Sequence, residues 1–424
     1  MIADTLHDSL VRAQDADADL ALLRAALAIP SVTGNETLFA RFLEGQLAEL
    51  GLKTRCDKFA GDRENVWAVA PGDRPNLMIL GHTDTVHVRG WEDHWHDDPR
   101  HDPFAAVIKD GSVWARGASD LKGGICAAIA GYRMLKKMAL NPGSGLTFAF
   151  IGDEESGEPG SGISAGIKNL LQRIAIAEIP RPDFAIYVEP TKLNIFTAQI
   201  GFFIADITVT GKSAYFGTPE LGVDALRAAH RLLANIWSHA EELDAGPRHD
   251  LVGPSSILVT HIEGGGFIAV PGNCKLSLIR KLRPGEVLDD AVTTFEQSLR
   301  LDTLPHEVDV VIDYPAGRDH PKGGSPVENR PDTAAIRLLQ DCVQQARPQC
   351  GQIAGAPYWS EMPFLTEQIG CPTVYYAPGD IAVAHTYEER IEIEEYLAAV
   401  RAFAHFIATF GASSSRQQIQ TEED

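Results

Sequence analysis

The chain has 424 residues, 44% hydrophobic and 22% charged, which is enough for two or three folded domains and excludes wholesale disorder. Its 37 Lys and Arg against 58 Asp and Glu give a formal net charge of −21, which argues against nucleic acid or a membrane surface as a partner. No apolar run approaches the roughly 18 residues of a membrane-spanning helix. The acidic start does not resemble a signal peptide, and the six cysteines contain no CxxC pair, so we expect a cytoplasmic protein without a disulfide framework.

Short apolar runs alternate with helical patterns along most of the chain. Helical spacing between residues 19 and 52, broken by a turn, predicts two helices, and an Ala-rich stretch predicts another at 123–138. Strands are predicted at 65–70, 77–80, 146–151, 184–188 and 371–377. Apolar strands that alternate with helices are typical of an α/β fold, in which a mostly parallel sheet carries helices on both faces.

The middle of the chain has a different pattern. Alternating apolar residues predict a strand at 202–210, and this strand is followed by a predicted order of helix, strand, strand, helix and strand. These elements are expected at 222–240, 256–262, 274–279, 287–299 and 307–312. The order is that of a ferredoxin-like α+β domain. We therefore expect residues 199–316 to be inserted into a domain built from 1–198 and 317–424, and the polar segment 413–424 to be a frayed tail.

Metal-binding residue types follow the predicted strands closely. LMIL precedes His82 and Asp84, LTFAFI precedes Glu154 and Glu155, and FAIYV precedes Glu189. His385 follows TVYYAPGD, and Asp120 stands directly before the Ala-rich helix. Singly, such residues are more often helix caps or solvated turns. Ligands gather beyond the carboxyl ends of parallel strands, so together these residues indicate one site.

A further histidine group occurs in WEDHWHDDPRHDPF. His94, His96 and His101 have a metal-like spacing, but no predicted strand precedes them. We expect this trio to lie in a solvated loop.

The segments GHTDTV, WARGASDLKGG, FIGDEESG, VEP and APGDIAVAHTYEE resemble, in this order, motifs of the M20 metallopeptidase and deacylase family. That family includes acetylornithine deacetylase, succinyl-diaminopimelate desuccinylase, aminoacylase and glutamate carboxypeptidase. The resemblance implies a di-metal catalytic domain and makes the insertion a lid and dimerisation domain, so that the protein would be a homodimer.

The same resemblance implies two divalent ions per subunit. His82 and Glu189 would bind one ion, Glu155 and His385 the other, and Asp120 would bridge the pair. Such an oxygen-rich donor set is compatible with Zn, Mn or Co. Two ions can share and activate one water molecule.

Two further carboxylates match the family's catalytic positions. Asp84 matches the carboxylate that would orient the imidazole of His82, and Glu154 matches the general base that would take a proton from the attacking water.

The substrate-binding positions depart from the family pattern. Tyr215 stands where the family has a histidine that reaches across the dimer to stabilise an amide oxyanion. A phenol donates a hydrogen bond but brings no positive charge. The substrate carboxylate would be held by Arg280 or Lys281, and Tyr358 with Trp359 would add aromatic surface.

We therefore expect amide hydrolysis in a small carboxylate-bearing substrate, an N-acyl amino acid or a dipeptide. The alternative is an aminohydrolase that releases ammonia from an electron-poor aromatic amine such as nitroanthranilate, where no amide oxyanion forms. In that case Tyr215, Phe216, Tyr358 and Trp359 would flank the ring by stacking. A minor alternative is a non-catalytic binding module on the same scaffold.

Overall fold

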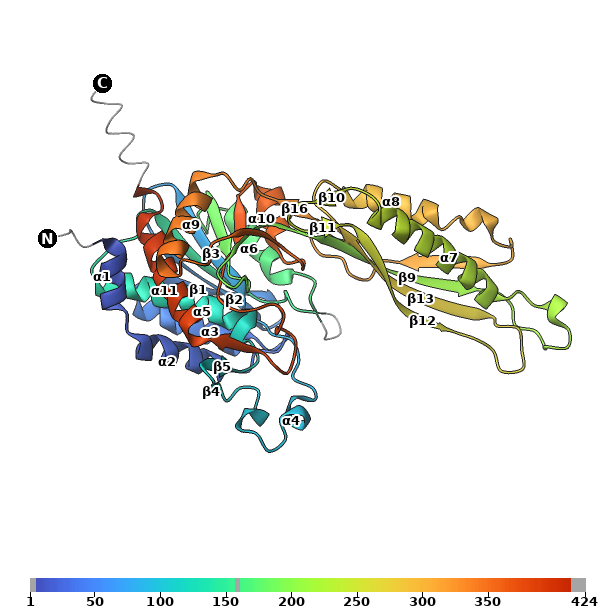
Figure 1. Cartoon of the computed structure of the whole chain (residues 1–424), viewed down its shortest axis with the longest axis horizontal. Helices are drawn as coiled ribbons and strands as arrows, with labels where there is room; N and C mark the ends of the chain where they lie inside the picture. The colour runs from blue at the N-terminus through green and yellow to red at the C-terminus, as the bar shows by residue number, and fades with distance from the viewer. Residues whose placement is uncertain (1–4, 157–160, 413–424) are drawn as a thin grey trace, which may run out of the picture. The chain divides into compact units, whose positions relative to one another are not determined.

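The computed structural model describes residues 5–156 and 161–412, so the polar segment 413–424 lies outside the described residues. The chain divides into two compact units (Figure 1). The first unit comprises Met1–Thr197, Asn329–Ala354 and Phe364–Asp424, and the second comprises Ala198–Glu328 and Gly355–Pro363. The second unit thus runs beyond the expected insertion at its carboxyl end and includes a short later segment as well.

The first unit is built on a sheet with the strand order β1-β2-β6-β3-β7-β18-β8. Its strands are β1 (Lys53–Ala60), β2 (Arg63–Ala70), β3 (Asn76–His82), β6 (Gly145–Ile151), β7 (Phe184–Tyr187), β8 (Ile195–Gln199) and β18 (Thr373–Tyr375). The neighbours β6, β3, β7 and β18 are parallel, while β1, β2 and β8 pair antiparallel. This confirms the predicted α/β fold with a mostly parallel central sheet.

Continuous apolar runs form the central strands because both of their faces are buried. Leu77–Leu80 of β3 are at most 1% exposed, and every residue of β6 is buried. The helices of this unit are α1 (Leu6–Ala13), α2 (Ala16–Leu27), α3 (Thr37–Glu49), α4 (Trp91–His94), α5 (Gly123–Lys137), α6 (Ala165–Ala175), α9 (Ala334–Ala346), α10 (Met362–Ile369, which begins in the second unit) and α11 (Ile393–Thr409). None of the helices in the described ranges is both long and apolar enough to cross a membrane.

A small sheet joins two distant parts of the first unit. Its strands, in the order β19-β5-β4, are β4 (Val107–Lys109), β5 (Ser112–Trp114) and β19 (Arg390–Glu392). β19 follows His385, and β5 leads to Asp120. Because these two strands pair, two candidate ligands that are far apart in the sequence come close together.

The second unit contains an antiparallel sheet with the strand order β12-β13-β9-β14. Its strands are β9 (Gly201–Thr210), β12 (Ser256–Gly264), β13 (Asn273–Leu282) and β14 (Asp309–Asp313), and its helices are α7 (Ala225–Asp244) and α8 (Leu288–Ser298). Of the short strands, β15 (Gly323–Gly324) pairs with β9, and β10 (Arg248–His249) and β11 (Gly253–Pro254) pair with each other. β16 (Val327–Glu328) and β17 (Ile353–Ala356, shared with the first unit) pair with β8 and extend the central sheet. The element order is the one predicted for a ferredoxin-like domain.

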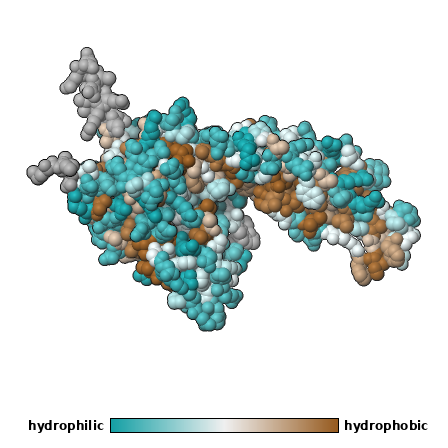
Figure 2. Space-filling view, viewed as in Figure 1, coloured by the Kyte–Doolittle hydropathy of each residue, from teal (hydrophilic) through white to brown (hydrophobic). Residues whose placement is uncertain are grey.

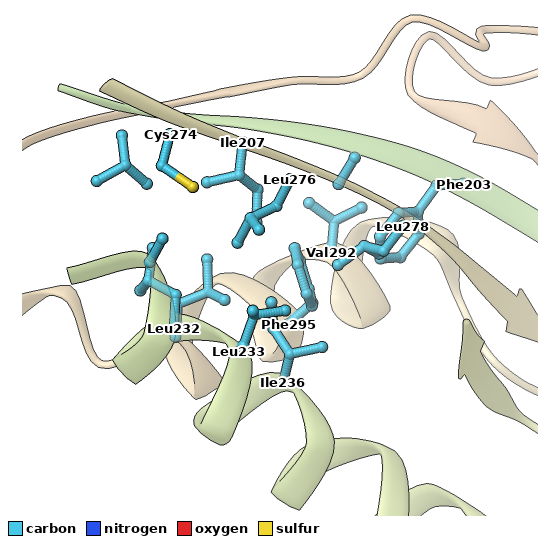
Figure 3. Packing of buried hydrophobic residues seen from close by; sticks show 14 of the residues in the cluster. Phe203, Ile207, Leu232, Leu233, Ile236, Cys274, Leu276, Leu278, Val292 and Phe295 are labelled. Carbon is cyan, nitrogen blue, oxygen red and sulfur yellow. The ribbon is translucent and has the colours of Figure 1, made fainter. Parts of the chain in front are cut away.

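One face of this sheet packs on both helices. Phe203 and Ile207 of β9 and Leu276 and Leu278 of β13 meet side chains of α7 and α8, including Phe295 (Figure 3). Burial alternates along both strands, so the intervening side chains lie on the opposite face.

Candidate metal centre

The candidate ligands emerge from one edge of the central sheet. His82 is the last residue of β3 and pairs with Ile151, the last residue of β6. β7, on the other side of β3, ends at Tyr187. Because these strands are parallel, Glu155 and Glu189 follow them at the same edge as His82.

Three of these residues form a first group. The Nε2 atom of His82 lies 3.1 Å from Oδ1 of Asp120 and 3.8 Å from Oε1 of Glu189. All three residues are buried, and one potential ligand atom from each lies within 4.8 Å of the others.

A second group adjoins the first through Asp120. The Nε2 atom of His385 lies 3.1 Å from Oδ2 of Asp120 and 3.0 Å from Oε1 of Glu155, and these three residues also offer converging ligand atoms. The two carboxylate oxygens of Asp120 therefore face two different histidines, which is the arrangement that a bridging ligand requires.

The charges at this site fit divalent cations. Burial by itself would lower the pKa of both imidazoles, but hydrogen bonds and nearby carboxylates outweigh it. They raise the pKa of His82 well above its usual value and that of His385 to about 11. Three carboxylates and two imidazoles thus converge, and such a donor set can hold divalent metal ions.

Asp84 supports the site mainly through the backbone. Nδ1 of His82 lies 2.9 Å from the Asp84 carbonyl oxygen but 3.8 Å from its carboxylate, so the carbonyl accepts the Nδ1 hydrogen and leaves Nε2 facing the site. The carboxylate instead accepts hydrogen bonds from the Glu155 amide and the Thr33 hydroxyl. Burial, opposed by His82, raises the pKa of Asp84 to about 7.

Glu154 lies at the rim of this arrangement. It is only partly buried, and its carboxylate converges with ligand atoms of His82 and Glu155. The preceding residue, Asp153, is fully buried and accepts backbone hydrogen bonds from Gly162 and nearby amides, which fixes the turn that carries Glu154.

Glu389 is a site residue that sequence reasoning missed. It is fully buried, and its Oε1 accepts the backbone amides of Ser119 and Asp120 at 3.1 and 3.0 Å. Its other oxygen pairs with Arg116. Since Glu389 stands four residues after His385, this carboxylate ties together the two segments that carry the second group of ligands.

The candidate substrate residues all lie in the second unit, but not at one place. Lys281 pairs with Phe202 near the start of β9. Tyr215 pairs with Ala269 and lies beyond the other end of β9, which is Thr210. At about 3.3 Å per residue, Phe202 and Thr210 of β9 lie about 26 Å apart. Tyr215 is 62% exposed and contacts Phe216, with ring centroids 4.6 Å apart.

The other candidate substrate residues, Tyr358 and Arg280, lie toward the start of β9. Tyr358 is half-buried next to Trp359, whose ring packs edge-on against Phe202. Arg280 is buried and paired with Glu286.

The histidine trio of the polar loop is not part of the centre. His94 lies 3.4 Å from Glu388, and His96 and His101 are exposed. None of the three belongs to the converging ligand groups found among residues 5–156 and 161–412.

Comparison with known proteins agrees with this geometry. The model of peptidase family M20/M25/M40 matches residues 78–409. Acetylornithine deacetylase of Myxococcus xanthus is 28% identical over 386 residues, covering 86% of this chain and 91% of that protein. Succinyl-diaminopimelate desuccinylase of Caulobacter sp. (strain K31) is 28% identical over 386 residues, covering 89% of this chain and 92% of that protein.

Solved structures share the fold at low identity. A Staphylococcus aureus tripeptidase aligns with a TM-score of 0.73 at 17% identity, covering 94% of this chain and 99% of its own. Human carnosine dipeptidase 1 aligns with a TM-score of 0.72 at 15% identity, covering 96% and 98%. The family match spans most of the sequence, which confirms the resemblance seen in the motifs: the chain belongs to peptidase family M20/M25/M40 and is a metal-dependent amide hydrolase.

Proposed function

We propose that the protein is a dinuclear hydrolase that cleaves the amide bond of a small carboxylate-bearing substrate, an N-acyl amino acid or a dipeptide. The observation that carries the proposal is the position of Asp120 between two histidines, each of which has a further carboxylate nearby. The relatives named as a deacetylase and a desuccinylase support an N-acyl substrate, and the structural neighbours named as peptidases support a dipeptide.

The roles of the residues follow from their placement. His82, Asp120 and Glu189 would hold one ion, and Asp120, Glu155 and His385 the other. When bound, two divalent ions polarise the scissile carbonyl and lower the pKa of a water molecule. Glu154 would take the proton of the attacking water and pass it to the leaving nitrogen, because its carboxylate lies beside the ligands without being enclosed by them.

Glu154→Gln tests this role. Loss of the general base should reduce turnover by roughly 100- to 10,000-fold while both ions stay bound. Steady-state kinetics and elemental analysis of the same preparation measure the two quantities. Glu178→Gln, at the surface of the first unit, is the matched control. Wild-type turnover in Glu154→Gln would remove Glu154 as the base.

The bond that is cleaved can be identified directly. Mass spectrometry of products from N-acyl amino acids, dipeptides and amino-substituted aromatic acids, with ammonia assayed in parallel, separates the candidate reactions. Free amino acid without ammonia is the expected result. Ammonia with a hydroxylated aromatic product would identify an aminohydrolase instead, and no product from any substrate would favour a binding module.

The arrangement of aromatic residues sets a condition for the ring reaction. Stacking by all four aromatic side chains would need Tyr215 and Phe216 beside Tyr358 and Trp359. The two pairs lie at opposite ends of β9, so one chain cannot place them around one ring, and the ring reaction would need Tyr215 and Phe216 from a second copy.

We also propose that two copies associate through their second units. β12 is an edge strand of nine residues, and Leu258 and Ile262 on it are 64% and 53% exposed. Apolar side chains are visible at the surface of this unit (Figure 2). A long, apolar edge strand offers unpaired backbone groups that a second copy could pair with.

A further inference from the structure

The candidate general base, Glu154, follows a residue in a strained backbone conformation. Asp153 is 0% exposed and has a φ of 74°, in the left-handed region. Such a conformation costs free energy in a residue other than glycine and persists only where the surroundings hold it. The Asp153 carboxylate accepts the backbone amides of Gly162, Ile163 and Ala165. The direction in which Glu154 leaves the turn therefore depends on what holds Asp153.

Arg63, the first residue of β2, reaches Asp153 from the central sheet. Its Nη1 lies 2.7 Å from Oδ1 of Asp153, and its side chain is 18% exposed. Its Nε and Nη2 lie 2.9 and 2.6 Å from Oε1 of Glu36. Because a guanidinium is planar and rigid, the bonds to Glu36 fix the direction of the bond to Asp153.

Glu36 gives this guanidinium a buried anchor. It stands directly before α3 and is 0% exposed, and a Cβ built on Gly152 would overlap its Oε1. Within residues 5–156 and 161–412, neither Glu36 nor Asp153 forms an ion pair with a cation other than Arg63. One cation thus serves two buried carboxylates, and its removal would leave both without a counter-charge.

A second residue of β2 holds the turn one position earlier. Oδ1 of Asn65 accepts the amide of Gly152 at 3.0 Å, and its Nδ2 donates to the carbonyl of Gly166 at 2.8 Å. These contacts fix the chain where β6 ends. Arg63, in contrast, contacts the residue adjacent to Glu154.

We propose that Arg63 is a positioning residue for the proposed reaction. Together with Glu36 it fixes the conformation of Asp153, and so the place of the Glu154 carboxylate relative to the water that it would deprotonate. Neither Glu36 nor Asp153 belongs to the converging ligand groups, so Arg63 acts on the base and not on the metal ions. The inference rests on the proposed function, which gives Glu154 the role of the base.

A double-mutant cycle of Arg63→Met and Glu154→Gln tests the inference in the metal-loaded, full-length protein. Arg63→Met should lower kcat by roughly 10- to 100-fold with both ions retained, because a displacement of about 1 Å can cost on the order of 100-fold in rate. In a chain that already carries Glu154→Gln, the same change should lower kcat by less than about threefold, since no base is left to position. Single-turnover kinetics on the amide found in the product screen, with elemental analysis, give both quantities.

Two further variants separate positioning from folding. Arg63→Lys keeps the charge but lacks the rigid fork, so it should fold and lose less turnover than Arg63→Met. Arg173→Met is the matched control, because Arg173 also binds one carboxylate, that of Asp57, through two nitrogen atoms and is 26% exposed. Its removal should lower the melting temperature and leave kcat unchanged.

Two results would overturn the positioning role: an unchanged kcat in Arg63→Met, or the same fold-loss of kcat with and without Glu154→Gln. Equal losses would show a general effect on the structure, since they would not depend on the base. A wild type that cleaves no amide would reject the proposed function instead. Amide hydrogen exchange of residues 152–156, faster in Arg63→Met than in Arg173→Met, would then still decide whether Arg63 holds the turn.

Discussion

Asp120 is the residue on which the candidate metal centre depends most. It is the one carboxylate shared by both ligand groups, and each of its oxygens lies 3.1 Å from a different imidazole. Asp120→Ala should therefore weaken both metal sites together, whereas Glu189→Ala should weaken mainly the site of His82. Elemental analysis after dialysis against a series of buffered metal concentrations measures both. Loss of a single ion from Asp120→Ala would contradict the bridging role.

The convergence of the candidate metal ligands was predictable because each follows a strand or stands at a helix start, where side chains of a parallel sheet converge. Glu389 gave no such signal, since it is one glutamate of an EER run and its partners are backbone amides distant in sequence. The burial of Arg280, in contrast, could have been predicted from the sequence. Cys274, Leu276 and Leu278 alternate toward it, and this period of two places Arg280 on the buried face of the strand.

At the scale of elements, α2 and α5 are joined by one buried side chain. Lys122, directly before α5, is 1% exposed. Its Nζ donates to the carbonyl oxygens of Ile29 at 2.6 Å and Ala26 at 3.2 Å, and it lies 4.3 Å from the ring centroid of Phe39. The lysine is thus a second donor to the Ala26 carbonyl, which also accepts the Ile29 amide at 3.3 Å, and it satisfies the carbonyl of Ile29 just beyond α2.

Lys122→Met should lower the free energy of unfolding by about 1–3 kcal/mol, because methionine fills similar space but removes the donor of the partly buried Ile29 carbonyl and one of the donors of the Ala26 carbonyl. Urea denaturation of the metal-free protein measures the change without a contribution from bound ions. Lys136→Met, on the exposed last turn of α5, is the control and should stay within about 0.5 kcal/mol of the wild type. Equal stability of the two variants would show that the carbonyls find other partners.

The elements whose apolar residues recur with a clear period were the ones predicted from the sequence. β3, β6, β7, β9 and α7 lie within a few residues of their predicted positions. The small sheet of β4, β5 and β19 was not predicted, because its strands are three residues long and β19 pairs with β5 across about 280 positions of sequence. A three-residue strand is too short to show a period, and its partner is decided by tertiary packing.

At the scale of the whole molecule, the edge of β12 leads to a prediction about assembly. The double variant Leu258→Lys and Ile262→Lys should convert a dimer into a monomer, because charged residues on an edge strand oppose edge-to-edge pairing. Light scattering after size-exclusion chromatography gives the mass. Val311→Lys, on the opposite edge strand β14, is the control. A wild type that runs as a monomer, or a double variant that remains a dimer, would reject association through β12.

The position of β18 in the central sheet has a consequence during synthesis. β18 lies between β7 and β8, yet it is made long after both. At 5–20 residues per second, the ribosome needs on the order of ten seconds or more to reach it after β8 has been made. Throughout that interval β7 lacks its neighbour on one side, and β8 lacks every strand that it pairs with in the folded sheet, since β16, β17 and β18 all follow it in the sequence. His385 follows β18, so the set of candidate ligands stays incomplete until this part of the chain has been made, and we expect metal loading to fall late in translation.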